Sequence, residues 1–160
     1  FASELVGMGY LFLEEPLPRQ LESYEQLRQL VNIPIAGGET LTRCTQFSEW
    51  IDKYALDIVQ PDANLTGIDD IVELQDSINE KTVELVLHNW ANDISNAANV
   101  QLGAALVGCS MVEFNVSYNP LRSRLVQESF VPEHGFFKMN ERPGLGVEFN
   151  DEILERYSCR

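Results

Sequence analysis

The chain has few basic residues and no long apolar run. Lys and Arg number 11 against 25 Asp and Glu, which gives a net charge of −14 at pH 7. Such a chain cannot neutralise a run of phosphates, so no nucleic-acid partner is expected. No segment approaches the roughly 20 apolar residues that cross a bilayer, and residues 1–5 lack the basic flank of a secretion signal. We therefore expect a cytoplasmic protein with no membrane partner.

Cysteine is also scarce. Cys44, Cys109 and Cys159 are odd in number and unevenly spaced, which matches neither a disulfide framework nor a zinc motif. We expect all three to be structural or surface thiols in a reducing compartment.

What the chain does contain is a repeat. Five polar residues each follow a short apolar run, at successive spacings of 25, 23, 26 and 25 residues: Glu14, Glu39, Asp62, His88 and Glu113. This period fits a strand, a helix and two loops, and the unbroken apolar runs are typical of parallel strands that are buried on both faces. Ionisable groups at the carboxyl ends of such strands are where a (β/α) barrel holds its catalytic residues.

The segments between these residues have helical spacing. Apolar stripes that include Leu30, Tyr54, Ile68 and Val72 predict the first three helices, and small residues in the fourth predict close packing on a sheet. The predicted helices cover residues 21–31, 45–54, 66–78, 93–107 and 151–157. Only five βα units can be counted, whereas a closed barrel has eight strands and about 250 residues. Because residues 1–9 also read as the second half of a helix, we expect part of a longer barrel.

Glu14 and Glu39 are candidate ligands of a divalent cation. Carboxylates at the ends of adjacent strands repel one another, and hard oxygen ligands favour Mg²⁺. The alternative is that each is a capping or salt-bridging carboxylate on a loop. Glu15 follows Glu14 directly, and because side chains alternate along a strand, only one of the two should face the barrel axis.

Asp62 and His88 follow neighbouring strands, so their side chains are expected to meet. An aspartate that accepts from one ring nitrogen fixes the tautomer and makes the other nitrogen a general base or acid. Glu113, in its protonated form, could donate a hydrogen bond to a bound carboxylate. The alternatives are a purely structural role for His88 and an ion pair between Glu113 and Arg122 or Arg124. His134 lies outside the repeat and is expected at the surface.

Six stretches resemble the mandelate racemase and muconate lactonising branch of the enolase superfamily. They cover essentially the whole chain in the correct order: Leu13-Glu14-Glu15-Pro16, Ile35-Ala36-Gly37-Gly38-Glu39, Gln60-Pro61-Asp62-Ala63, Leu87-His88-Asn89-Trp90, Val112-Glu113-Phe114-Asn115 and Arg142-Pro143-Gly144-Leu145-Gly146-Val147. The resemblance implies an α/β fold, the C-terminal part of a modified (β/α) barrel. Residues 1–118 would supply strands equivalent to the fourth to eighth, with the N-terminal capping domain and first strands absent. Residues 119–160 would form a loop and short helix that pack back on the barrel or the cap.

The same resemblance implies roles for the residues in the repeat. Glu14 and Glu39 would be the second and third Mg²⁺ ligands, Asp62 and His88 the acid/base dyad, and Glu113 the donor to the substrate carboxylate or enediolate. The first metal ligand and a second-strand lysine have no counterpart here. The implied activity is Mg²⁺-dependent dehydration of an acid sugar, in a homo-oligomer, with the isolated 160 residues inactive. The alternatives are a racemase or epimerase of a 2-hydroxy acid and a non-catalytic barrel segment.

Overall fold

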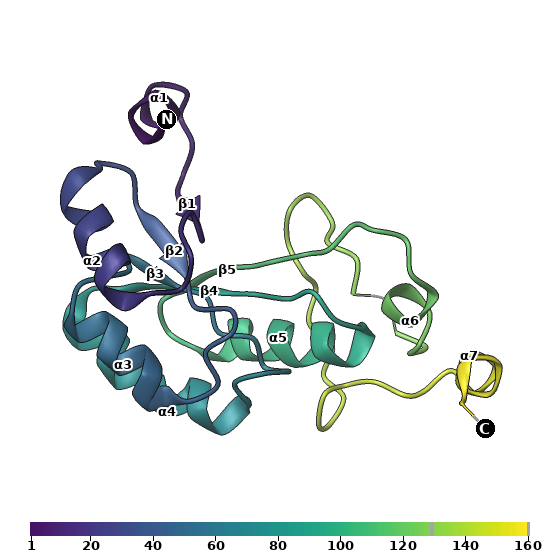
Figure 1. Cartoon of the computed structure of the whole chain (residues 1–160). Helices are drawn as coiled ribbons and strands as arrows, with labels where there is room; N and C mark the ends of the chain where they lie inside the picture. Colours follow the sequence, from purple (N-terminus) through teal and green to yellow (C-terminus); the bar gives the residue numbers. More distant parts are fainter. Residues whose placement is uncertain (129, 160) are drawn as a thin grey trace.

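The computed structural model describes residues 1–128 and 130–159 (Figure 1). Five parallel strands form one sheet in the order β1-β2-β3-β4-β5, so each strand pairs with its neighbour in the chain. The strands are β1 (Leu13–Glu14), β2 (Ile35–Gly37), β3 (Ile58–Val59), β4 (Glu84–Leu87) and β5 (Cys109–Val112). This sequential parallel order confirms the predicted α/β class and the pattern of consecutive βα units.

Helices connect the strands, and the intervening loops place the repeat residues at one end of the sheet. The helices are α1 (Ala2–Gly7), α2 (Leu21–Leu30), α3 (Cys44–Asp52), α4 (Ile68–Lys81), α5 (Asp93–Ala105), α6 (Pro120–Ser123) and α7 (Asp151–Tyr157). All five helices predicted between residues 21 and 157 are present, with ends that differ by a few residues. No helix in the described part of the chain is long and apolar enough to cross a membrane.

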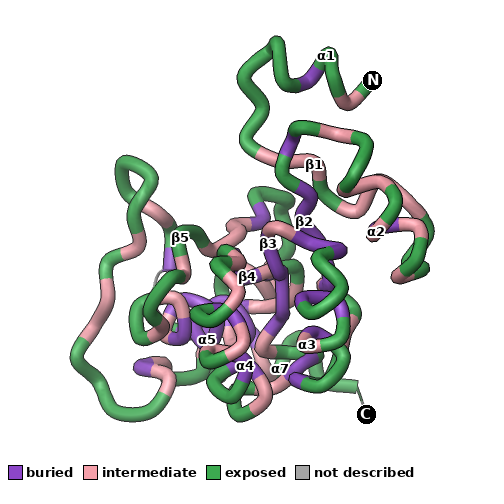
Figure 2. The backbone as a smooth tube through the Cα atoms, turned by 90° about the vertical axis from the view of Figure 1, so that its left-hand side faces the viewer, coloured by how far each residue is buried: buried purple, intermediate pink, exposed green. Residues whose placement is uncertain are grey.

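Both faces of the sheet are apolar, which explains the unbroken apolar runs. Ile35, Val59 and Leu85 belong to the main core, where they are buried with residues of the covering helices such as Phe47 and Ile71. A separate cluster contains Ala36, Ile58 and Val86, with Phe12 packed against it. Successive residues of each strand thus point to opposite faces. Figure 2 shows that burial is concentrated around β2, β3 and α5, while α1 is mostly exposed.

The predicted apolar stripes are partly wrong. Leu30, Tyr54, Ile68 and Val72 are all exposed. Leu30 is the last residue of α2, and Tyr54 lies beyond the end of α3 with a φ of 52°, so neither side chain can follow the stripe. In α4 the buried residues are Ile71, Leu74 and Ile78. The buried face of this helix therefore does not include Ile68 and Val72.

Small residues in α5 permit the predicted close packing on the sheet. A Cβ atom added at Gly103 would lie 2.5 Å from Cγ2 of Val112 on β5. Beyond β5, Val126 and Phe130 are buried with Ala97 and Val100 of α5. The division of the chain at residue 118 stays a prediction. Cys44 is buried, Cys109 half-buried and Cys159 exposed, and all three are free thiols.

Candidate functional site

The five repeat residues follow the five strands at the same edge of the sheet. Glu14 is the last residue of β1, and His88 and Glu113 come directly after β4 and β5. Glu39 and Asp62 lie in the loops that follow β2 and β3. Because the strands are parallel and in sequential order, their carboxyl ends bring these side chains to one rim.

His88 and Asp62 form the expected pair. Nδ1 of His88 lies 2.9 Å from Oδ2 of Asp62. The other carboxylate oxygen, Oδ1, accepts from the backbone N–H of Asn64 at 2.8 Å and from Nδ2 of Asn99 at 3.2 Å. Burial by itself would raise the pKa of Asp62, but the hydrogen bonds from His88, Asn64 and Asn99 outweigh it and lower that pKa. Asp62 is therefore held as a carboxylate that orients the imidazole.

The second imidazole nitrogen of His88 faces two further carboxylates. Nε2 lies 3.3 Å from Oε2 of Glu39 and 3.5 Å from Oε2 of Glu113. The hydrogen bond to Asp62 raises the pKa of His88 most; burial opposes this, and the charges of Glu113 and Glu39 add to the rise. His88 thus has one nitrogen fixed by Asp62 and one nitrogen directed at the rim, the arrangement that a general base requires.

Glu14 lies on the same rim but has its own partner. Its Oε1 accepts from Nε2 of Gln60 on the neighbouring segment at 3.0 Å. Burial raises the pKa of Glu14, and the negative charges of Glu113 and Glu39 raise it further. Glu15 points elsewhere, because its Oε1 accepts from the backbone N–H of Gly38 at 3.2 Å. The two adjacent glutamates therefore differ in orientation.

Arg19 is a rim residue that the repeat did not predict. Its Nε donates to Glu15 at 2.6 Å and its Nη2 donates to Oε1 of Glu39 at 2.8 Å. Glu39 therefore forms a salt bridge in this structure. This agrees with the alternative prediction for Glu39, a salt-bridging carboxylate on a loop. Arg19 lies in the loop after β1, outside the phase of the repeat, and the sequence gives no signal that would have identified it.

The alternative pairing of Glu113 with an arginine is not found in the described part of the chain. The Arg122 guanidinium donates instead to the backbone carbonyls of Trp90, Ala91 and Ser117. Oε2 of Glu113 accepts from the backbone N–H of Asn89 at 3.0 Å. His134 is exposed, as predicted.

Buried amides were also missed by the sequence interpretation. Gln60, Asn89, Asn96 and Asn99 are all buried, although a polar residue in a helix or loop is by default assigned to solvent. Position is a signal for two of them: Asn96 and Asn99 are three residues apart on α5, on either side of Ala97 and Ala98.

The donor chemistry of the rim fits a divalent cation in part. Glu14 and Glu39 offer hard carboxylate oxygens. Burial raises the pKa of Glu14 most, and the negative charges of Glu113 and Glu39, which a cation would offset, raise it further. Across residues 1–128 and 130–159, however, no three His, Cys, Asp or Glu side chains are grouped to hold a metal. Glu14 and Glu39 could thus supply only part of a coordination shell.

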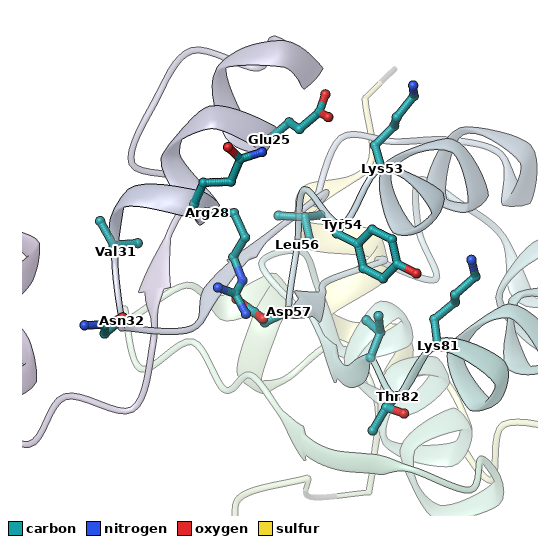
Figure 3. A pocket seen from close by; sticks show the side chains of 12 residues that line it. Glu25, Arg28, Val31, Asn32, Lys53, Tyr54, Leu56, Asp57, Lys81 and Thr82 are labelled. Atoms are coloured by element: carbon teal, nitrogen blue, oxygen red, sulfur yellow. The ribbon is translucent and has the colours of Figure 1, made fainter.

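A large cavity lies away from this rim. It has a volume of about 670 Å³ and is lined by residues such as Arg28, Asp57 and Lys81, near the amino-terminal ends of β2, β3 and β4. Figure 3 shows the Arg28 side chain directed at Asp57, and their ion pair measures 2.6 Å. Lys81 is paired with Asp52 at 3.2 Å. Since its cations are largely neutralised and the repeat residues are elsewhere, this cavity is not the candidate active site.

Comparison with known proteins identifies the family. The model described as "Enolase C-terminal domain-like" matches residues 1–153. The chain belongs to this family. The match confirms the resemblance to the mandelate racemase and muconate lactonising branch of the enolase superfamily. Family membership therefore agrees with the order of the six motifs along the chain.

Relatives and solved structures within the family carry names from sugar-acid metabolism. An arabinonate dehydratase from Saccharolobus solfataricus is 32% identical over 98% of this chain and 42% of its own length. The crystal structure of a 3,6-anhydro-D-galactonate cycloisomerase from Zobellia galactanivorans has a TM-score of 0.89 and 30% identity, over 98% of this chain and 45% of that one. An enolase from Agrobacterium radiobacter with bound Na and L-malate has a TM-score of 0.88 and 25% identity, over 97% and 43%. The chain thus spans less than half the length of these proteins.

Proposed function

We propose that the protein that carries this chain is a Mg²⁺-dependent lyase. It would abstract the proton next to the carboxylate of an acid sugar and eliminate water. The observation that carries the proposal is the position of His88, whose Nδ1 contacts Asp62 at 2.9 Å while Nε2 lies 3.3 Å from Glu39 and 3.5 Å from Glu113. Support from the family comes from the arabinonate dehydratase, which is 32% identical to this chain.

In the proposed reaction, Nε2 of His88 takes the proton from the carbon next to the carboxylate. The electron pair of the broken C–H bond moves toward the carboxylate, giving an enediolate. Asp62 supports this step, because its hydrogen bond to Nδ1 holds the imidazole in the tautomer with a free lone pair on Nε2 and stabilises the imidazolium that forms. The raised pKa of His88 makes that nitrogen a stronger base.

Charge that develops on the substrate carboxylate needs stabilisation at the same rim. Glu113, oriented by the backbone N–H of Asn89 at 3.0 Å, would hydrogen-bond this carboxylate when protonated. Glu14 and Glu39 would hold Mg²⁺, whose positive charge lowers the cost of placing negative charge next to it. The cation would also allow a chain of net charge −14 to bind an acid.

Elimination completes the reaction. The bond from the β-carbon to its hydroxyl oxygen breaks, and the hydroxide leaves as water after it gains the proton that His88 holds. The enol product then tautomerises to a 2-keto-3-deoxy acid. If a second acid instead delivered a proton to the opposite face of the carbon, the reaction would be a racemisation or epimerisation.

The test is a product assay on the full protein with Mg²⁺ and a panel of aldonic and aldaric acids in D₂O. We expect a semicarbazide-reactive 2-keto-3-deoxy acid and loss of product formation with EDTA. Deuterium at the α-carbon without loss of water would favour the racemase alternative. If the full protein neither binds Mg²⁺ nor exchanges a substrate proton, the chain is a non-catalytic barrel segment.

A further inference from the structure

Three side-chain amides are buried between the strand ends and α5. Asn89 and Asn96 are each 4% exposed and Asn99 is 0% exposed. Burial of an amide costs free energy unless its donors and acceptors are satisfied. Asn96 and Asn99 lie on α5, which also buries Ala97, Ala98 and Val100. An apolar residue would therefore be the usual choice at positions 96 and 99.

Asn99 holds the Asp62 loop. Its Nδ2 donates to Oδ1 of Asp62 at 3.2 Å, and its Oδ1 accepts from the backbone N–H of Ala63 at 3.0 Å. One amide therefore fixes both the carboxylate and the main chain that carries it. Since Oδ1 of Asp62 is held from α5, the remaining oxygen, Oδ2, is left facing Nδ1 of His88.

Asn89 holds Glu113 in a similar way. Its backbone N–H donates to Oε2 of Glu113 and its Nδ2 donates to the backbone carbonyl of the same residue, both at 3.0 Å. The loop after β4 is thereby tied to the end of β5. Asn89 directly follows His88 in the chain. Of the carboxylates around the imidazole, Asp62 and Glu113 are thus each anchored by an asparagine.

The two anchors are joined to each other. Nδ2 of Asn89 also donates to Oδ1 of Asn96 at 2.8 Å, and Nδ2 of Asn99 lies 3.5 Å from Oδ1 of Asn89. In a water-excluded interior such linked hydrogen bonds restrict one another's geometry. The network connects Asp62 and Glu113 through α5 without passing through His88.

We propose that Asn89 and Asn99 are positioning residues that hold Glu113 and Asp62 at fixed places on either side of His88. The inference rests on the proposed function. Asn99 is the sharper case, because within the described residues its side chain hydrogen-bonds Asp62 and Ala63 but neither His88 nor Glu14 and Glu39. Loss of Asn99 frees Asp62 to rotate, so the imidazole loses the partner that selects its Nδ1–H tautomer.

The experiment compares Asn99→Leu with Val100→Ala in the full protein. Asn99→Leu keeps the number and branching of the side-chain heavy atoms but removes the hydrogen bonds to Asp62, Ala63 and Asn89. Val100 is next to Asn99 on α5 but is buried in a different cluster, with Val126 and Phe130. Val100→Ala therefore serves as a control for loss of stability alone. Asn99→Ser, a smaller polar change, is measured as well, so that the inference can still be tested if Asn99→Leu fails to fold.

Two readouts are followed. The first is the ¹⁵N NMR spectrum of the imidazole of His88, assigned by its absence in His88→Asn, which reports the tautomer without any turnover. The second is the split between kcat and KM. We expect both Asn99 variants to lose the Nδ1–H tautomer in part and to lower kcat by about 10- to 100-fold with KM within about twofold. Val100→Ala should leave the tautomer and kcat unchanged while lowering the melting temperature.

Wild-type tautomer proportions and a wild-type kcat in a folded Asn99 variant would overturn the inference, as would an equal loss of kcat in Val100→Ala. The imidazole spectrum separates this outcome from failure of the proposed function. If the wild-type protein has no turnover but the tautomer still shifts in the Asn99 variants, positioning stands and the dehydratase proposal fails.

Discussion

Oδ2 of Asp62 lies 2.9 Å from Nδ1 of His88, although the two residues are 26 positions apart in the chain. Each side chain follows one of two adjacent parallel strands, β3 and β4. The pairing leaves Nε2 of His88 free to face Glu39 and Glu113. The two ring nitrogens therefore have different surroundings, and this asymmetry is what a directed proton transfer needs.

His88→Asn should abolish exchange of the substrate α-proton while leaving the fold and Mg²⁺ affinity unchanged. The amide can still donate a hydrogen bond to Asp62 but cannot take a proton, and loss of a general base typically costs about 10²- to 10⁴-fold in rate. Exchange in D₂O, followed by NMR, measures the effect. His134→Asn is the matched control, because His134 is exposed and lies outside the repeat. Unchanged turnover in His88→Asn would contradict its role.

Asp93→Asn should change how stability depends on pH. Burial raises the pKa of Asp93 to about 6, against hydrogen bonds from Leu125 and Val126 that lower it. The ordinary carboxyl pKa is about 4, so between roughly pH 4 and 6 the folded state binds more protons than the unfolded state. This group therefore makes the protein less stable as pH rises through that window.

The measurement is urea unfolding at pH 4.5 and pH 7. When the pH is raised from 4.5 to 7, the free energy of unfolding of Asp93→Asn should increase relative to that of the wild type. This holds whether the variant is more or less stable than the wild type at either pH. Asp151→Asn, at the exposed start of α7, is the control and should follow the wild-type pH dependence. An identical pH dependence in Asp93→Asn and wild type would show that Asp93 titrates normally.

Gly103→Ala should destabilise the protein by about 1–3 kcal/mol, because the added methyl group must displace Val112 or shift α5 from β5. A Cβ at this position would lie 2.5 Å from Cγ2 of Val112. Gly7→Ala, in α1, meets nothing within 4 Å and should be neutral or slightly stabilising. Thermal unfolding of the two variants compares a packed glycine with a free one, and equal effects would disprove the close-packing interpretation.

The 160-residue chain studied alone should self-associate. In the described part of the chain, β1 and β5 each have one strand neighbour, so each presents an open backbone edge. Apolar side chains near these edges, including Leu11 and Met111, are exposed. Light scattering should give a mass above the 18.1 kDa of one chain. Met111→Lys should reduce association, whereas Leu30→Lys, on α2, should not. A monodisperse monomer would contradict the expectation.

The pairing of Asp62 with His88 was predictable because strand order alone decides it. The repeat places both residues after apolar runs, and parallel neighbours share one edge. The contact of Arg19 with Glu39 was not predictable in the same way, because it depends on the conformation of a long side chain in an irregular loop. The exposure of Leu30 and Tyr54 also escaped prediction, since it follows from where α2 and α3 end.

The residue pattern alone predicts the alternation of strands and helices, the sheet order and the rim at which five ionisable residues gather. These properties follow from periodic burial and short connections, which are local features of the chain. The folded chain reveals further contacts: Asn89 and Asn99 are buried, Asn99 anchors Asp62, and Nε2 of His88 faces Glu39 and Glu113. Such contacts depend on side-chain rotamers and on distances between elements far apart in the chain, which no local pattern encodes.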